Sequence, residues 1–151
     1  CYSGLCAGMN VSMKNDYNIT VLRGQSVSEI LISPDSIGYT GIESPSVVLA
    51  LSAEGVARRR KIFADLTSDT FVVKAKSVAI PETNASVLEV DFKELKVKKQ
   101  DWALASLGII AKKEKAVTRQ MLAFAVKLRF KEKVAQIAME TIEKIFETET
   151  I

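Results

Sequence analysis

The 151-residue chain contains no histidine and only two cysteines. Without histidine it lacks the commonest general base near neutral pH and the commonest metal ligand, which excludes histidine-dependent triads and histidine-based metal sites. Cys1 and Cys6 alone are too few to hold an iron–sulfur cluster or a structural zinc ion. We therefore expect no metal to be bound by this chain alone.

Other chemical signals are missing as well. The glycine loops G-x-x-x-x-G-K-[ST] and G-x-G-x-x-G do not occur, and the carboxylates are scattered without a spacing that suggests an acid and base pair. The net charge is +3, but no basic window is interleaved with aromatic residues, and no apolar run approaches the ~20 residues of a membrane span. We expect neither nucleic acid nor membrane as a partner. The absence of a signal peptide and of a disulfide framework predicts a cytoplasmic protein.

What the chain does contain is enough apolar sequence, 48%, for one domain spanning residues 1–151. Residues 1–11 read as the tail of a helix that runs into a turn or strand. Alternating patterns predict two antiparallel strands, and a continuous apolar run predicts a strand covered on both faces. A helix and two further strands follow, so the order predicts an α/β fold with a mixed or parallel sheet. The predicted strands are residues 17–22, 27–33, 46–52, 70–74 and 86–92, and the helix is 53–66.

The last third of the sequence is helical in pattern. We expect one helix over residues 98–113, and then a second helical segment over 118–147 that bends near Arg129 to Lys133, because unbroken it would be ~45 Å long. The final helix could instead bind a partner or a membrane surface, but its apolar content favours a place in the core. The spacing predicts that its packed face consists of Val134, Ile137, Ala138, Ile142 and Ile145.

One candidate binding site follows the buried strand. Ser52 stands where a helix N-cap belongs, and Ser52, Glu54 and Gly55 lie at the carboxyl end of a strand, where α/β sheets tend to bind anions. Arg58 to Arg60 come one turn later. Consecutive side chains fan around a helix by ~100° each, so the three arginines cannot all reach one ligand, and a solvated face is the favoured interpretation.

The other candidate is the hairpin in "KNDYNITVLRGQSVSEILIS", where polar residues gather at both ends of two short strands. A plain surface hairpin, with Gly24 at positive φ, explains it about as well as a contact surface does. The residues that we predict to face a partner or cofactor are Lys14, Asn15, Asp16, Arg23, Gly24, Ser26, Ser28 and Glu29.

At these residues the chain resembles the gamma subunit of 2-oxoacid:ferredoxin oxidoreductases, which include the pyruvate and 2-oxoglutarate enzymes. The resemblance is carried by Asn15-Asp16-Tyr17, by Gly24-x-Ser26-x-Ser28-Glu29, and by an apolar strand ending in Ser52-x-Glu54-Gly55. The segments "DWALASLGIIAKK" and "LRFKEKVAQIAMETIEKI" are similar to the C-terminal helices of that family. The resemblance covers nearly the whole chain.

The resemblance implies a three-layer β/β/α domain with a mixed sheet and C-terminal helices. It also implies a chain that completes a complex with alpha and beta subunits and is inactive alone. In that family the complex uses thiamine diphosphate, iron–sulfur clusters and coenzyme A, converts a 2-oxoacid to an acyl-CoA, and passes electrons to ferredoxin. No catalytic residue is assigned to this chain. The alternative is a stand-alone α/β module that binds an anionic or coenzyme A-type ligand at Ser52 to Gly55.

The sequence departs from the family at its beginning. Family members usually begin with a strand and a glycine-rich turn before the first helix, and here the chain starts inside that helix. Loss of a first strand would leave an unpaired edge and an exposed apolar face, so we expect the segment before Cys1 to be absent from this sequence rather than from the protein.

Overall fold

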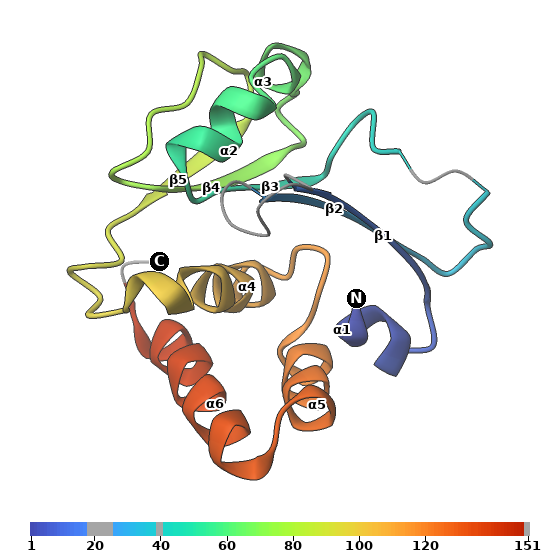
Figure 1. The fold of residues 1–151 in the computed structure, drawn as a ribbon, viewed down its shortest axis with the longest axis vertical. Coiled ribbons are helices and arrows are strands. Elements are labelled where there is room, and N and C mark those ends of the chain that lie inside the picture. Colours follow the sequence, from blue (N-terminus) through green and yellow to red (C-terminus); the bar gives the residue numbers. More distant parts are fainter. Residues whose placement is uncertain (18–25, 39–40, 150–151) are drawn as a thin grey trace.

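The computed structural model describes residues 1–17, 26–38 and 41–149. In this part of the chain, helices and strands form a mixed α/β arrangement (Figure 1). The elements are α1 (Tyr2–Cys6), β1 (Asn10–Tyr17), β2 (Ser26–Ser33), β3 (Val47–Ala50), α2 (Ala53–Arg58), α3 (Ile62–Asp65), β4 (Phe71–Ala75), β5 (Ser86–Val90), the 3-10 turn η1 (Lys99–Asp101), α4 (Trp102–Lys112), α5 (Arg119–Arg129) and α6 (Glu132–Glu147).

The centre of the molecule is a parallel sheet with the strand order β3-β4-β5. The middle strand β4 is apolar without alternation, and Val72 and Val73 are both fully buried, because helices cover the sheet on its two faces. In Figure 1, α2 and α3 lie on one side of the sheet and α4 on the other. The prediction of a mixed or parallel sheet is therefore confirmed. The α/β class with C-terminal helices is confirmed as well.

The strands β1 and β2 form a separate antiparallel hairpin, whose register runs from Asn10 opposite Ser33 to Tyr17 opposite Ser26. The second strand was predicted to within one residue, whereas the first strand, which we expected to begin at Tyr17, already begins at Asn10. Residues 18–22, which we expected to be a strand, lie outside the described residues. Lys14 to Asp16 belong to the middle of β1 rather than to a lead-in, since a hairpin with exposed surface tolerates polar side chains along the strand.

The single helix predicted over 53–66 is two short helices. Arg59 ends α2 with a φ of −115°, and its N–H reaches the carbonyls of both Gly55 and Val56. The chain then turns into α3, which brings Phe63 into the core at 2% exposure. The expected apolar side chains are buried, but two helices rather than one carry them.

The C-terminal helices pack below the sheet, with α4 between the sheet and α6 and with α1 against α5 (Figure 1). At Gly108 the two helices α4 and α6 are in close contact, and a Cβ built there would lie 3.4 Å from Ile145 Cβ, an ordinary van der Waals distance. The bend near Arg129 to Lys133 is confirmed, because α5 ends at Arg129 and α6 begins at Glu132.

The predicted packed face of α6 is only partly correct. Ala138, Ile142 and Ile145 are buried, as expected. Val134 and Ile137 are 50% and 56% exposed, because the buried stripe of α6 is narrower than the run of apolar residues.

Candidate functional site

The polar end of the hairpin is joined to the end of α2 by ion pairs. Lys14 lies opposite Glu29 in the register, so Asp16, two residues further along β1, projects from the same face as Glu29. The arginines of α2 meet this face. Arg58 donates from Nε to Asp16 Oδ2 (2.9 Å) and from Nη2 to Asp16 Oδ1 (2.6 Å), a two-pronged contact.

Arg59 binds both strands at once. Its Nη2 atom lies 2.9 Å from Glu29 Oε1 and 3.6 Å from Asp16 Oδ2, while its Nε atom is buried without a hydrogen-bond partner. The side chains of Asp16, Glu29, Arg58 and Arg59 are between 21% and 31% exposed. Fully exposed pairs are worth about 0–1 kcal/mol, and salt screens partly buried pairs such as these less. We call these four residues the hairpin clamp.

The clamp corrects the interpretation of the arginine run. Arg58 and Arg59 form ion pairs with the hairpin instead of lying on a solvated face. Arg60, the third arginine of the run, is exposed. A signal was present in the sequence, because two acidic residues at one hairpin end must find cations if they are half buried. Nothing in the sequence told which of the 21 basic residues would supply them.

The other predicted hairpin residues fall on different faces. Asn15 and Ser28 are register partners, and the Ser28 hydroxyl donates to Asn15 Oδ1 at 2.7 Å. They lie on the face opposite Asp16 and Glu29. Ser26 is exposed at the start of β2, and Arg23 and Gly24 lie outside the described residues. The structure thus brings Asp16 and Glu29 together and pairs Asn15 with Ser28.

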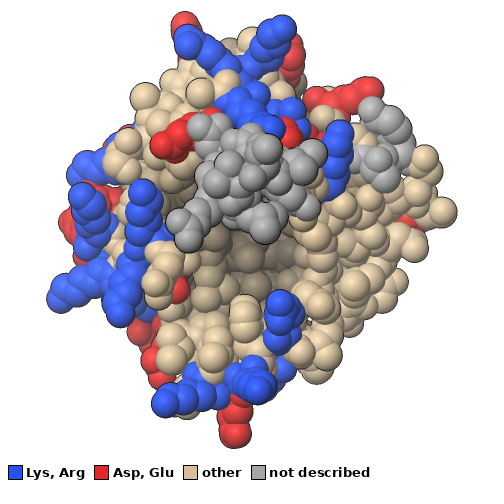
Figure 2. Space-filling model, in the orientation of Figure 1, with Lys and Arg blue, Asp and Glu red and all other residues tan. Residues whose placement is uncertain are grey.

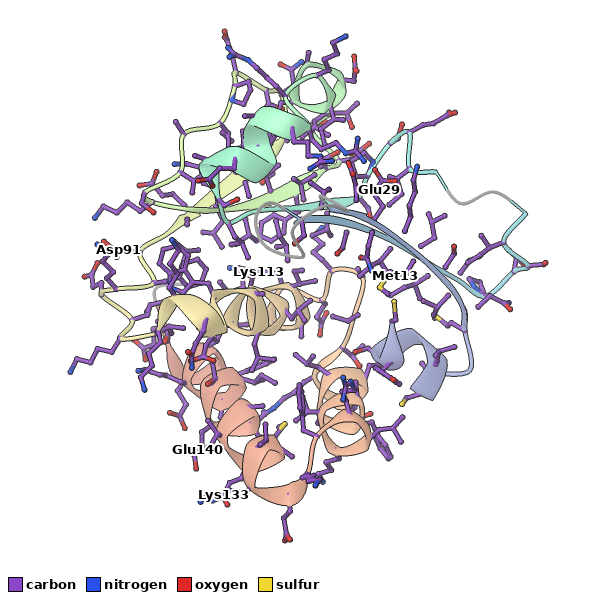
Figure 3. The ribbon with its side chains drawn as sticks, viewed as in Figure 1. Met13, Glu29, Asp91, Lys113, Lys133 and Glu140 are labelled. Carbon is purple, nitrogen blue, oxygen red and sulfur yellow. The ribbon has the colours of Figure 1, made fainter. Side chains whose placement is uncertain are left out.

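The part of the hairpin that packs against α1 is apolar. Met13 and Ile30 are register partners and remain 54% and 40% exposed. Figure 3 shows Met13 on the side that faces α1, and Glu29 on the side nearer α2. Figure 2 shows a hollow in the middle of this view, between the hairpin and the helices. The hairpin therefore has one face held by charge and one apolar face that is only partly covered.

Ser52, Glu54 and Gly55 occupy the first turn of α2. The predicted N-cap is confirmed, because the Gly55 N–H donates to Ser52 Oγ at 3.1 Å. That bond already engages the Gly55 N–H, one of the donors that an anion at this helix end would need. The carboxylate of Glu54 also stands in the first turn of a helix of only six residues.

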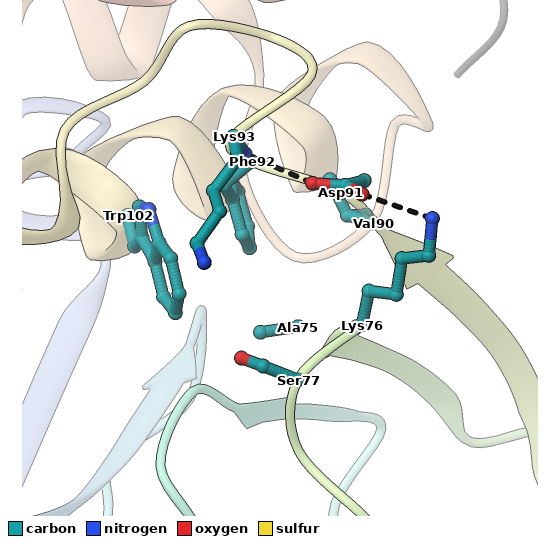
Figure 4. A pocket seen from close by; sticks show the side chains of 8 residues that line it. All are labelled: Ala75, Lys76, Ser77, Val90, Asp91, Phe92, Lys93 and Trp102. Atoms are coloured by element: carbon teal, nitrogen blue, oxygen red, sulfur yellow. Dashed lines mark hydrogen bonds and ion pairs between the residues drawn. The ribbon is translucent and has the colours of Figure 1, made fainter.

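A small hollow of about 190 Å³ lies at the carboxyl ends of β4 and β5 (Figure 4). Lys76 Nζ lies 2.9 Å from Asp91 Oδ2, and Asp91 Oδ1 accepts hydrogen bonds from the N–H groups of Lys93 and Glu94. The hydrogen bond from Lys76 holds the pKa of Asp91 below its ordinary value, and Asp91 in turn raises the pKa of Lys76. Phe92 and Trp102 stack on one side with centroids 5.1 Å apart.

Sequence reasoning missed the Lys76–Asp91 pair, although a signal existed. Ala75 and Val90 are register partners in the parallel sheet, so the residues that follow them leave the sheet side by side. Each carboxylate and ammonium group here is satisfied by the other or by backbone. Such a pair stabilises the strand ends and offers no free acid or base.

Among the described residues, neither a group of metal ligands nor a membrane-spanning helix is present. In residues 1–17, 26–38 and 41–149, no three His, Cys, Asp or Glu side chains stand close enough to hold a metal ion. None of the helices in that part of the chain is both long and apolar enough to cross a membrane. The fold and its polar clusters therefore define a mixed α/β domain whose most elaborate feature joins a hairpin to a helix.

Comparison with known proteins assigns this chain to a family. The sequence matches the family described as "Pyruvate ferredoxin/flavodoxin oxidoreductase" over residues 2–148. The chain belongs to this family. No curated protein sequence matches it significantly.

Solved structures show the same fold at low sequence identity. The gamma subunit of keto/oxoacid ferredoxin oxidoreductase from Geobacter sulfurreducens PCA superposes with a TM-score of 0.71 at 17% identity, over 97% of this chain and 84% of that one. Subunit PORC of pyruvate oxidoreductase from Thermotoga maritima gives 0.68 at 16% identity, over 97% and 83%. The 2-oxoglutarate:ferredoxin oxidoreductase from Magnetococcus marinus, solved with 2-oxoglutarate, coenzyme A and succinyl-CoA, gives 0.76 at 14% identity, over 95% of this chain and 26% of that one.

Proposed function

We propose that this chain is the gamma component of a 2-oxoacid:ferredoxin oxidoreductase and acts in complex with alpha and beta subunits. The observation that carries the proposal is the family match over residues 2–148, because it covers nearly the whole chain. The fold shared with two gamma-type subunits from other organisms supports the same assignment.

The reaction proposed for the assembled enzyme is oxidative decarboxylation of a 2-oxoacid to an acyl-CoA, with electrons passed through iron–sulfur clusters to ferredoxin. Thiamine diphosphate would supply the carbanion chemistry. The described residues include no group of three or more His, Cys, Asp or Glu side chains that could hold a metal ion. We assign the cofactors to the partner subunits, and the complex to the cytoplasm.

The role proposed for this chain is to present the hairpin to those subunits. Lys14, Asn15, Ser26 and Ser28 are exposed, so they are available to a partner, whereas Asp16 and Glu29 are engaged by the clamp. We include Arg23 and Gly24, between the two strands, among the contact residues. In this view Asp16 and Glu29 orient the surface rather than contact the partner.

The test is to purify the tagged chain from its source organism and identify what copurifies. We expect subunits of a thiamine diphosphate-dependent oxidoreductase, 2-oxoacid- and coenzyme A-dependent reduction of a viologen dye by the complex, and none by the isolated chain. An Arg23→Ala variant should lower recovery or activity of the complex and leave the circular dichroism spectrum unchanged. A catalytically active monomer would contradict the proposal.

A second measurement separates a gamma component from an independent binding module. Ligand that binds only the folded state raises stability by about 2.7 kcal/mol at a hundred times its Kd. Coenzyme A should leave the melting temperature of the isolated chain unchanged. Clear protection without any partner would instead favour an anion site at Ser52, Glu54 and Gly55.

A further inference from the structure

The junction of α5 and α6 carries an exposed apolar surface that the fold does not use. Half of the large apolar side chains that are exposed in the described residues come from this one stretch of sequence. They are Phe124, Leu128, Phe130, Val134 and Ile137, with exposures of 69%, 65%, 40%, 50% and 56%. The buried faces of the same helices consist of other residues, so these side chains are surplus to the core.

One of these five side chains, Phe130, also lines a concave site. A groove of about 410 Å³ runs between the end of α5 and the start of α6, within the ~300–1,000 Å³ typical of binding sites. Its apolar lining comes from Phe130, Ala135 and Met139, and its polar lining from Lys127, Glu132 and Gln136. We call it the α5–α6 groove.

The segment 127–133, which contributes Lys127, Phe130 and Glu132 to the groove, is strongly basic. It contains four exposed cations and one acidic residue, Glu132, so its net charge is +3, as much as that of the whole chain. The four cations, which we call the basic rim, are Lys127, Arg129, Lys131 and Lys133. In the described part of the chain no ion pair joins any of these four to a carboxylate. Figure 2 shows basic side chains gathered along the lower edge of the molecule, where α5 and α6 meet.

We propose that the α5–α6 groove binds a segment of a partner subunit that inserts a large apolar side chain between flanking Asp or Glu residues. This inference rests on the proposed function and deepens it by adding a second contact surface and its chemistry. An apolar anchor in a pocket supplies affinity, while carboxylates opposite the basic rim speed association and fix orientation.

Two other occupants fit the groove less well. A second copy of the chain would bring two segments 127–133, each of charge +3, together across an isologous contact, which like-charge repulsion opposes. A lipid surface suits a convex amphipathic face, whereas this site is concave and has Glu132 and Gln136 in its wall.

The test compares three variants of the full chain with the wild type in binding to the copurified and purified subunits. Lys127→Glu with Lys131→Glu should weaken binding at least about tenfold at low salt, and Phe130→Ser about tenfold or more. Lys98→Glu with Lys99→Glu makes the same charge change beside α4 and should bind like the wild type. Circular dichroism and melting temperature of each variant establish that it folds.

The outcomes separate this inference from the proposed function. Equal binding by all the variants would overturn the groove and leave the gamma assignment intact. No binding of oxidoreductase subunits by the wild type would overturn both. Binding of the wild type to phosphatidylserine vesicles, lost in the Lys127 and Lys131 variant while subunit binding is unchanged, would also overturn it, in favour of a membrane surface.

A photo-crosslinking residue tests the chemistry of the occupant. Gln136→benzoylphenylalanine places the crosslinker in the groove wall, within the assembled complex. We expect a single partner peptide with an apolar residue and carboxylates on either side. A crosslink to a peptide without carboxylates, or no crosslink in the intact complex, would overturn the proposal.

Discussion

In the parallel sheet β4 buries Val72 and Val73 completely, whereas the hairpin leaves Met13 and Ile30 about half exposed and relies on Asp16 and Glu29 to reach α2. The sheet is thus held by apolar burial, which ordinary salt and pH changes leave nearly untouched. The hairpin is held by half-buried charges and by α1 on its apolar face. We therefore expect the two regions to respond to different variables, and the hairpin to open at a lower free energy than the sheet.

The largest effect that separates the two regions is expected from Gly4, where α1 contacts the hairpin. A Cβ at this position would lie 2.7 Å from Val11 Cγ2 and 2.9 Å from Ile32 Cγ2. Gly4→Ala should therefore lower the free energy of unfolding, or of local opening of the hairpin, by about 1–3 kcal/mol, measured by urea titration and amide hydrogen exchange.

Gly108→Ala is the matched control in α4. Its Cβ would lie 3.4 Å from the nearest atom, and alanine gains up to about 1 kcal/mol in helix propensity, so stability should stay within about 1 kcal/mol of the wild type. If Gly4→Ala behaved like Gly108→Ala, the packing of α1 would not be what holds the apolar face.

A smaller effect is expected from the hairpin clamp. A double-mutant cycle with Glu29→Gln and Arg59→Gln should give a coupling energy of about 0.5–1 kcal/mol that shrinks at high salt. In both single variants, Glu29→Gln and Arg59→Gln, amide hydrogens should exchange faster than in the wild type in β1 and β2 but not in β4. Arg60→Gln, next in the chain and exposed, is the control. Equal acceleration in β4 would show that the clamp and the sheet form one cooperative unit.

The smallest effect is expected from Asp91→Asn. The pKa of Asp91 lies below its ordinary value of 3.8, so its contribution is present above that pH and is lost as the pH falls through the folded value. The pKa of Lys76 lies above 10.5, so its contribution is present below that pH and is lost as the pH rises through the folded value.

The stability difference between wild type and Asp91→Asn should thus be flat between about pH 5 and pH 9 and shrink on both sides. Urea titrations across this range measure it. A difference that varied within the flat range would point to another titrating group.

The sequence predicted those parts of the structure whose residue pattern follows from burial. It did not predict those that depend on contacts between charged side chains. The continuous apolar run of β3, the N-cap at Ser52 and the bend before α6 were all predictable, because each follows from local periodicity or capping chemistry. The position of β1 was not, because polar residues on its exposed surface resemble a loop. The clamp was not either, since Asp16 and Arg58 are 42 positions apart and nothing local links them.

The placement of Val134 and Ile137 shows a related limit. Both have the spacing of core residues, and their exposure is decided by which side of α6 its neighbours cover. A pattern of apolar residues shows that a face is to be buried, but not whether this chain or another one buries it. Phe130 in the α5–α6 groove is a further apolar side chain that the fold of this chain leaves exposed.

The arginine contacts of the clamp also bear on how the two strands find their alignment. A slip of β1 by one residue would turn Asp16 to the opposite face of the hairpin and replace it with a neutral side chain, so that the two hydrogen bonds from Arg58 to Asp16 would be lost while Glu29 on β2 stayed near Arg59. The arginines sit on a helix outside the hairpin, so their positions do not shift with the strands. A misaligned pairing of the strands is therefore less favourable. The four charges therefore act as a check on strand register during folding, in addition to fastening the hairpin once it has formed.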